Sequence, residues 1–205
     1  MEKIERRTTG VTGLDFPLDG GFPVGTSIIV YGHPLSGVDL MAKQFWKPET
    51  SEEKEEGTYL ILDEDPSKGM IEAGEMDLQK IAKKIEHIRD KKEGSRIIVD
   101  SLSTLIRKYG AEDVLTFVRK DIKETLNKGP NVMFTLYEGL HKEEELLLIM
   151  RAVDIFVQLR ESILGNEVER TFWIRKIKGQ KIPQRVVPFL ITEKGLELST
   201  TSRVI

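Results

Sequence analysis

The stretch Ile28-Ile29-Val30-Tyr31-Gly32-His33-Pro34-Leu35-Ser36-Gly37-Val38-Asp39 decides the fold of this chain. Its four leading apolar residues predict a short strand buried on both faces, and residues 38–46 predict a helix that Pro48 ends. The two outer glycines of the loop keep the spacing of the phosphate-binding pattern G-x-x-x-x-G-K-[ST]. Val38 stands where that pattern needs lysine, and Asp39 stands where it needs serine or threonine. The sequence therefore predicts a strand–loop–helix unit with the shape of a phosphate loop but without its charge.

Strands and helices alternate after this unit. An amphipathic helix begins after Asp77, an N-cap residue, and Gly94 stops it. From residue 154 onward strand follows strand, with a turn at Gly165-Asn166. Strands are predicted at residues 59–62, 97–99, 132–136, 155–159, 171–177 and 186–192, helices at about 112–128 and 143–151, and loops at 8–25 and 49–56. This order predicts an α/β fold with a central, mostly parallel sheet flanked by helices and antiparallel strands at the C-terminal end.

Composition excludes several classes of protein. The chain has 205 residues, 39% of them hydrophobic and 32% charged, which predicts one globular domain over residues 1–205. It contains no cysteine, so disulfides and thiolate chemistry are excluded, and its net charge of -3 gives no overall attraction for nucleic acid. Without a membrane-length apolar run or a signal sequence, we expect a cytoplasmic protein with no membrane contact. The many Lys and Glu residues are typical of hyperthermophile proteins.

Acidic residues follow two of the predicted strands. Asp63-Glu64 comes after the strand at 59–62, and Asp100 comes after the strand at 97–99. Ligands of open α/β sheets bind outside the carboxyl ends of the strands. We therefore expect these acids and the loop at 32–39 to line one site. The three histidines (His33, His87 and His141) have no ligand spacing, and no function is assigned to them.

The residues before the loop carry a family resemblance. Thr9-Gly10-Val11-Thr12-Gly13-Leu14-Asp15, followed by Leu18-Asp19-Gly20-Gly21-Phe22-Pro23-Val24-Gly25, resembles the opening string of the KaiC-like branch of the RecA superfamily. Residues 62–66, 97–101, 174–179 and 189–196 resemble further segments of that family. The resemblance implies a RecA-like P-loop NTPase fold. It also implies that Glu64 prepares the attacking water, that Asp100 supports the magnesium shell, and that Lys176 and Lys178 reach the nucleotide of a neighbouring subunit.

The chain departs from the family at the positions that matter most for catalysis. Lysine and threonine are missing at 38 and 39, and Leu35 replaces a glycine that helps the backbone wrap the phosphates. Lys178 stands where arginine is usual, which removes a bidentate fork. A carboxylate at Asp39 about 4 Å from a phosphate charge repels it by roughly 4 kcal/mol at an effective dielectric of 20. The loop therefore predicts weak or lost nucleotide binding, with Asp39 complementing the helix dipole and pairing with Lys43.

Our leading hypothesis is a catalytically degenerate KaiC-like domain with a degenerate Walker A motif. It acts as a structural or regulatory protein through a protein partner or a homo-oligomer, with Glu64 and Asp100 as vestigial positions. No cofactor or metal is expected under this hypothesis.

Three alternatives stay open. The chain is an atypical ATP-binding protein or ATPase, using ATP and magnesium, in which Lys176 or Lys178 of a neighbour completes the site. Or it binds nucleic acid through the basic, aromatic stretch 170–185. Or Asp39, Glu64 and Asp100 together hold a cation.

Overall fold

The computed structural model describes residues 4–48, 57–90, 96–127, 129–182 and 186–199. The loop predicted at 49–56, the helix stop at Gly94, the helix end at Lys128 and the basic residue Arg185 lie outside these ranges. The described strands are β1 (Arg6–Arg7), β2 (Phe22–Pro23), β3 (Ser27–Gly32), β4 (Thr58–Ile61), β5 (Ile71–Glu72), β6 (Arg96–Asp100), β7 (Asn131–Tyr137), β8 (Ile155–Leu164), β9 (Glu167–Ile177), β10 (Val187–Thr192) and β11 (Gly195–Leu198). The helices are α1 (Val38–Trp46), α2 (Leu78–Arg89), α3 (Leu102–Tyr109), α4 (Ala111–Phe117), α5 (Lys123–Leu126) and α6 (Glu143–Ala152), with short 3₁₀ turns η1 (Phe16–Leu18) and η2 (Pro34–Ser36) and a π-helical turn η4 (Val118–Ile122).

Nine of these strands form one sheet in the order β11-β10-β9-β8-β3-β7-β6-β4-β5. All neighbours from β8 to β5 run parallel, and β9, β10 and β11 extend the sheet antiparallel. The predicted fold class is thereby confirmed, including the antiparallel strands at the C-terminal end. Strand β3 lies inside the sheet between β7 and β8, which explains why it is apolar on both faces.

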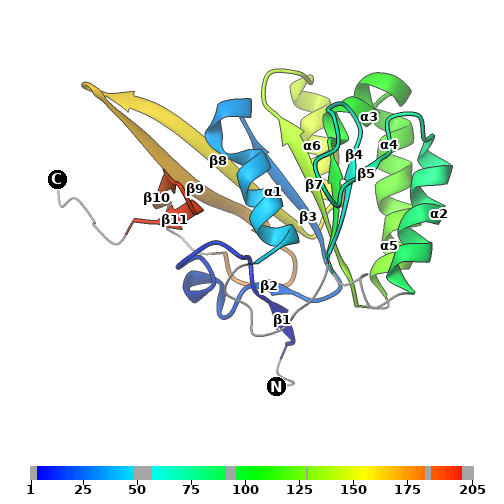
Figure 1. Cartoon of the computed structure of the whole chain (residues 1–205), viewed down its shortest axis with the longest axis horizontal. Coiled ribbons are helices and arrows are strands. Elements are labelled where there is room, and N and C mark those ends of the chain that lie inside the picture. The colour runs from blue at the N-terminus through cyan, green and yellow to red at the C-terminus, as the bar shows by residue number, and fades with distance from the viewer. Residues whose placement is uncertain (1–3, 49–56, 91–95, 128, 183–185, 200–205) are drawn as a thin grey trace.

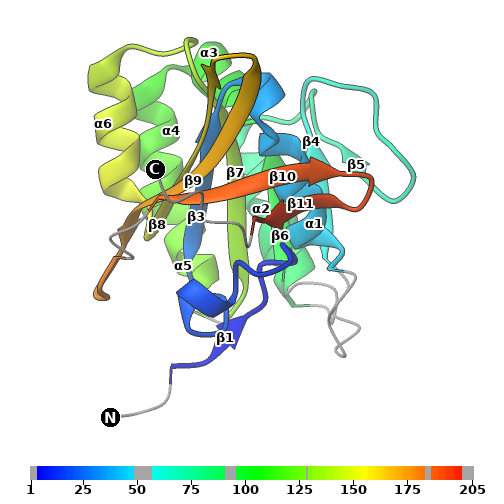
Figure 2. The ribbon, with the colours of Figure 1, turned by 90° about the vertical axis from the view of Figure 1, so that its left-hand side faces the viewer.

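Helices cover both faces of the sheet (Figures 1 and 2). On one face, α1 packs through Val38, Met41 and Phe45 against apolar residues that include Val157 and Phe172. On the other face, helices α2 to α6 enclose a second core, to which α6 contributes Ile149. The carboxyl ends of β3, β4, β6 and β7 therefore meet at one edge of the sheet, beside the N-terminus of α1. That edge is the expected position of a site.

The Gly-rich opening segment has structural work in this fold. The Asp15 carboxylate accepts hydrogen bonds from the Thr9 backbone N–H and hydroxyl, both at 2.7 Å, and from the Thr8 hydroxyl. Gly10 has a φ of +75°, and a Cβ there would lie 2.2 Å from the backbone oxygen of Gln44 in α1. The sequence predicted only turns in this segment, but β1 and β2 also pair antiparallel across it. The segment thus ties the N-terminus to α1.

Two stretches differ from the predicted elements. A helix directly after β6, α3, was not predicted, although Ser101 caps it by accepting a 3.2 Å hydrogen bond from the Thr104 N–H. The helix is only eight residues long, and Gly110, with a φ of +85°, separates it from α4. The predicted helix at 112–128 is interrupted by the π-helical turn η4. Strands β8 and β9 are longer than predicted because they continue as a hairpin beyond the sheet, around Gly165-Asn166 (Figure 1).

Candidate functional site

The loop after β3 folds back on itself. His33 receives two backbone N–H groups: Ser36 donates to its carbonyl at 2.9 Å, and Leu35 donates to its Nδ1 at 3.4 Å. The Ser36 hydroxyl also donates to the His33 carbonyl, at 2.7 Å. A phosphate loop holds its ligand with backbone N–H groups that face inward. In this loop the amides of Leu35 and Ser36 are used by the turn itself.

The two outer glycines of the loop are explained by packing alone. A Cβ on Gly32 would lie 2.5 Å from the Ser36 hydroxyl oxygen and 2.7 Å from the Leu159 carbonyl oxygen. Gly37 has a φ of +96°, and a Cβ there would lie 2.9 Å from a methyl group of Leu196. Both positions therefore need glycine without any bound phosphate.

The two side chains that replace lysine and threonine point in different directions. Val38 is fully buried and belongs to the core beneath α1. Asp39, in the first turn of α1, lies 3.3 Å from Lys43 one turn later. Both features match the predictions that Asp39 is the helix's N-terminal acid and that Lys43 pairs with it. A carboxylate at a helix N-terminus and an (i, i+4) ion pair each stabilise an exposed helix by a few tenths of a kcal/mol.

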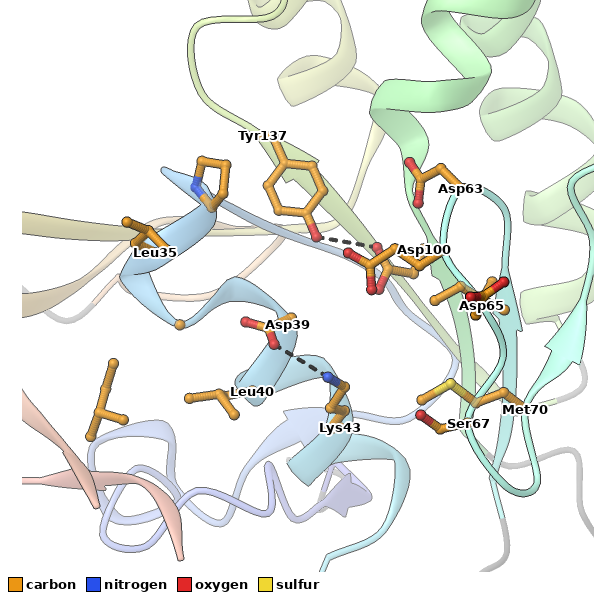
Figure 3. A pocket seen from close by; sticks show the side chains of 15 residues that line it. Leu35, Asp39, Leu40, Lys43, Asp63, Asp65, Ser67, Met70, Asp100 and Tyr137 are labelled. Atoms are coloured by element: carbon orange, nitrogen blue, oxygen red, sulfur yellow. Dashed lines mark hydrogen bonds and ion pairs between the residues drawn. The ribbon is translucent and has the colours of Figure 1, made fainter. Parts of the chain in front are cut away.

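The expected site residues meet around one cavity of about 670 Å³. Figure 3 shows it between α1 and the segment after β4, with Tyr137 and Asp100 at its back. Its charged lining residues are Asp39, Asp63, Glu64, Asp65, Asp100 and Lys43. Pro34, Leu35, Leu40, Ile61, Met70 and Ile191 supply apolar surface. Among the described residues that line the cavity, Lys43 is the sole cation, and it already pairs with Asp39. The cavity is therefore acidic and partly apolar.

Asp100 lies at the inner wall and is only 5% exposed. Its carboxylate accepts hydrogen bonds from the hydroxyls of Tyr59 and Thr135 and, at 3.4 Å, from the hydroxyl of Tyr137. Burial raises the pKa of Asp100, an effect that the nearby Asp63 carboxylate reinforces and these hydroxyls oppose. Burial beside Asp100 also raises the pKa of Tyr59 and of Tyr137. Asp100 is thus held by the protein's own hydroxyls.

The acids after β4 behave differently from Asp100. Asp63 accepts a 3.0 Å hydrogen bond from the Ser101 hydroxyl and another from the Thr104 hydroxyl, so its carboxylate lies at the N-terminus of α3. Glu64 and Asp65 are exposed at the mouth of the cavity. Within the described part of the chain, no group of three or more His, Asp or Glu side chains is placed to hold a metal ion.

Lys176 and Lys178 lie away from this cavity. Strand β9 runs antiparallel to β8, so its C-terminal end is at the opposite edge of the sheet. The Lys176 ammonium donates to three carbonyls at the end of α6: Met150 at 3.0 Å, Arg151 at 2.9 Å, and Val153. Burial lowers the pKa of Lys176. Lys178 is exposed and lies 3.4 Å from Asp154. Lys176 therefore has an intramolecular role, as a cap of α6.

The basic stretch 170–185 does not form one continuous face. Arg170 pairs with Glu161 at 3.7 Å on the hairpin, and Phe172 is buried. Trp173 lies between the guanidinium groups of Arg160 and Arg175, each 4.8 Å from its ring. The lysines of the stretch lie further along the chain, at the other edge of the sheet. The histidines come from three separate elements; burial lowers the pKa of His141, which bonds the Ser103 hydroxyl at 2.9 Å.

Sequence reasoning missed the hydroxyl groups that surround Asp100. Tyr59 and Thr135 come from β4 and β7, the two strands that flank β6, and their side chains face the same side as Asp100. A polar residue inside an otherwise apolar buried strand was the available signal, since buried polar groups need partners. Pairing them with Asp100 required the strand order, which the sequence does not state.

A family model described as "Family of unknown function (DUF7125)" matches residues 6–203. The chain belongs to this family. The DUF7125 chain is 24% identical, over 96% of its length, to the circadian clock oscillator protein KaiC of Synechococcus elongatus. It is 25% identical, over 98% of its length, to the circadian clock protein KaiC3 of a Synechocystis strain. The alignments cover 44% and 47% of these relatives, so the chain spans less than half of their length.

The DUF7125 chain also resembles a solved structure of a KaiC-like protein from the hyperthermophilic archaeon Pyrococcus horikoshii. The TM-score is 0.82 at 18% identity, and the match covers 96% of this chain and all of the other. These likenesses confirm the predicted membership of the KaiC-like branch of the RecA superfamily and the predicted fold. In the described part of the chain, no helix is both long and apolar enough to span a bilayer.

Proposed function

We propose that this DUF7125 protein is a catalytically degenerate KaiC-like domain that does not hydrolyse ATP and acts through protein–protein contacts. The observation that carries the proposal is the state of the loop at 32–39. Two of its amides bond to His33, Val38 is in the core, and Asp39 faces the cavity. A nucleotide phosphate would meet a carboxylate where it needs a lysine and a hydroxyl.

The magnesium side of the site supports the same proposal. Mg²⁺ in nucleotide sites is held by one or two carboxylates together with the substrate phosphates. Asp100 is the acid that the resemblance assigns to this role, and its oxygens accept three protein hydroxyls. The residues present therefore do not fit a Mg–ATP complex. The alternative in which Lys176 completes a neighbour's site is disfavoured, because its ammonium caps α6 in its own chain.

Calorimetry with ATP and magnesium tests the proposal. We expect no binding to the wild type and measurable binding to Val38→Lys with Asp39→Thr, because the pair restores the missing attraction. Val38 is buried, so Asp39→Thr alone, at a position on the rim, serves as a second variant in case the pair fails to fold. Removing the carboxylate is expected to relieve repulsion without supplying the lysine, and to give at most weak binding.

Turnover by the pure protein provides the opposing outcome. ATP hydrolysis by the wild type that Glu64→Gln abolishes would contradict the proposal, because it would make Glu64 a working acid. Glu112→Lys, on the exposed side of α4, is a matched control for a lost surface carboxylate. We expect background rates from all three proteins.

A further inference from the structure

Strand β9 presents a basic surface on the face of the sheet opposite α1. Phe172 and Ile174 face the core beneath α1, so Trp173 between them faces the other side. The guanidinium groups of Arg160 and Arg175 each lie 4.8 Å from the Trp173 ring. Arg160 is exposed, while Trp173 and Arg175 are partly exposed. We call Arg160, Trp173 and Arg175 the platform.

The charges of the platform are not compensated locally. Within the described residues, neither Arg160 nor Arg175 forms an ion pair with a carboxylate, whereas the neighbouring Arg170 pairs with Glu161. Stacking on the indole holds each guanidinium, and Arg175 also reaches the Gln158 side-chain oxygen at 3.5 Å. Two cations are thereby fixed in position on either side of an aromatic ring. Arginine and tryptophan are the residue types that dominate binding energy at protein interfaces.

The mouth of the cavity has the opposite character. Glu64 and Asp65 are exposed and, in the part of the chain that the structure describes, form no ion pair. Leu35, 72% exposed, and Ile191, 38% exposed, place apolar surface beside them. We call these four residues the acidic rim. Its charges complement the two guanidinium groups, and its apolar side chains offer contact surface to an indole.

The platform and the acidic rim cannot meet within one molecule. The rim lies on the α1 face of the sheet, at the carboxyl ends of the strands, and the platform lies on the face that carries α6 (Figures 1 and 2). We propose that a second copy of this chain docks its platform against the acidic rim, so that Arg160 and Arg175 of one copy enter the acidic cavity of the next. This inference rests on the proposed function, because it requires the cavity to be free of nucleotide.

Docking of this kind is heterologous, since different surfaces of the two copies meet. Each added copy leaves one rim and one platform unused, so association continues until a ring closes or a filament forms. The association is electrostatic at its core and weakens with added salt. The same geometry excludes a symmetric rim-to-rim dimer, in which like charges would face each other.

Two charge-reversal variants test the inference by sedimentation velocity over a series of protein concentrations. The rim variant carries Glu64→Lys and Asp65→Lys, and the platform variant carries Arg160→Glu and Arg175→Glu. We expect each variant alone to need at least about tenfold more protein than the wild type to associate. The matched controls Glu112→Lys and Arg119→Glu, both at exposed positions on the α4–η4 side, should associate like the wild type. Arg160→Glu alone, at an exposed position, replaces the platform variant if that variant fails to fold.

Mixing the two variants gives the sharpest result. The rim variant keeps a working platform and the platform variant keeps a working rim, so a 1:1 mixture should form a dimer that does not grow further. A mixture that stays monomeric, or variants that associate like the wild type, would overturn the inference. So would single-stranded DNA binding that the rim variant keeps and the platform variant loses, because the platform would then be a nucleic-acid surface.

The outcome also separates this inference from the proposed function. A wild type that binds no ATP and remains monomeric at every concentration would overturn only the docking of a second copy. A wild type that binds ATP would contradict the proposed function, whatever its state of association.

Discussion

Asp100 shows how a residue of a catalytic pattern can be enclosed by its neighbours. Its position after β6 is where the resemblance places a magnesium-supporting acid, yet three hydroxyls from β4 and β7 surround it. Each hydroxyl that donates to the carboxylate occupies a lone pair that a metal-bound water would need. At the scale of the residue, the site differs from an active one both in the substitutions at 38 and 39 and in the partners of the acid that remains.

The raised pKa of Asp100 predicts a characteristic dependence of stability on pH. Because the folded protein binds the proton more tightly than the unfolded chain, the stabilisation from protonated Asp100 is present below its unfolded pKa and lost as pH rises through its folded pKa. We therefore expect the unfolding free energy of the wild type, minus that of Asp100→Asn, to fall as pH rises above about 4. Urea unfolding between pH 3.5 and 7 measures this difference.

Thr135→Val provides an internal check on that prediction. The Thr135 hydroxyl lowers the pKa of Asp100, so its removal should extend the fall to higher pH. A difference that grows with pH would contradict the assignment, since it would mean that Asp100 is stabilised as an anion in the folded protein.

Helix α6 illustrates the same lesson at the scale of the element. Its last turn leaves carbonyl groups without helical partners, and the Lys176 ammonium from β9 accepts that role for three of them by donating hydrogen bonds. A cation at a helix C-terminus also complements the helix dipole. The lysine that the family resemblance assigns to a neighbouring subunit is thus built into the contact between β9 and α6.

Lys176→Met tests this capping role. The substitution keeps much of the apolar stem but removes hydrogen bonds from a charged donor, so we expect a loss of about 1–3 kcal/mol in unfolding free energy. Lys181→Met, at an exposed position without a bonded partner among the described residues, is the matched control and should change stability by less than about 0.5 kcal/mol. Equal stability of the two variants in urea unfolding would show that the cap contributes nothing measurable.

Charge is divided over the whole molecule into separate regions. The cavity gathers carboxylates on the α1 face, the platform holds two guanidinium groups on the other face, and Lys176 and Lys178 lie at the opposite edge of the sheet. A nucleic-acid backbone needs a continuous basic track to release several counterions at once. The fold divides the stretch 170–185 among these places, and the net charge of the chain is -3.

We therefore expect no retention of the wild type on single-stranded DNA at about 0.15 M salt, with little change when Arg170 and Lys178 are both replaced by glutamine. A chromatographic salt series on immobilised DNA measures this. Tight retention with a steep salt dependence, reduced in the double variant, would restore the nucleic-acid alternative.

Local sequence determined the elements of this protein and their order. Apolar runs of strand length, helical periodicity in Leu78–Arg89 and the Gly-rich opening string specify a RecA-like α/β chain, because such signals depend on neighbours only a few residues apart. The loop at 32–39, Asp63-Glu64 and Asp100 were also placed together correctly, since carboxyl ends of parallel strands share one edge.

Only the tertiary structure decided what those residues touch. It buries Val38, turns the loop amides onto His33, surrounds Asp100 with hydroxyls from two other strands, and directs Lys176 to α6. Each of these contacts joins residues whose proximity follows from strand order, register or the closure of a turn. Local sequence patterns do not encode such distances, whereas the packed sheet fixes every one of them.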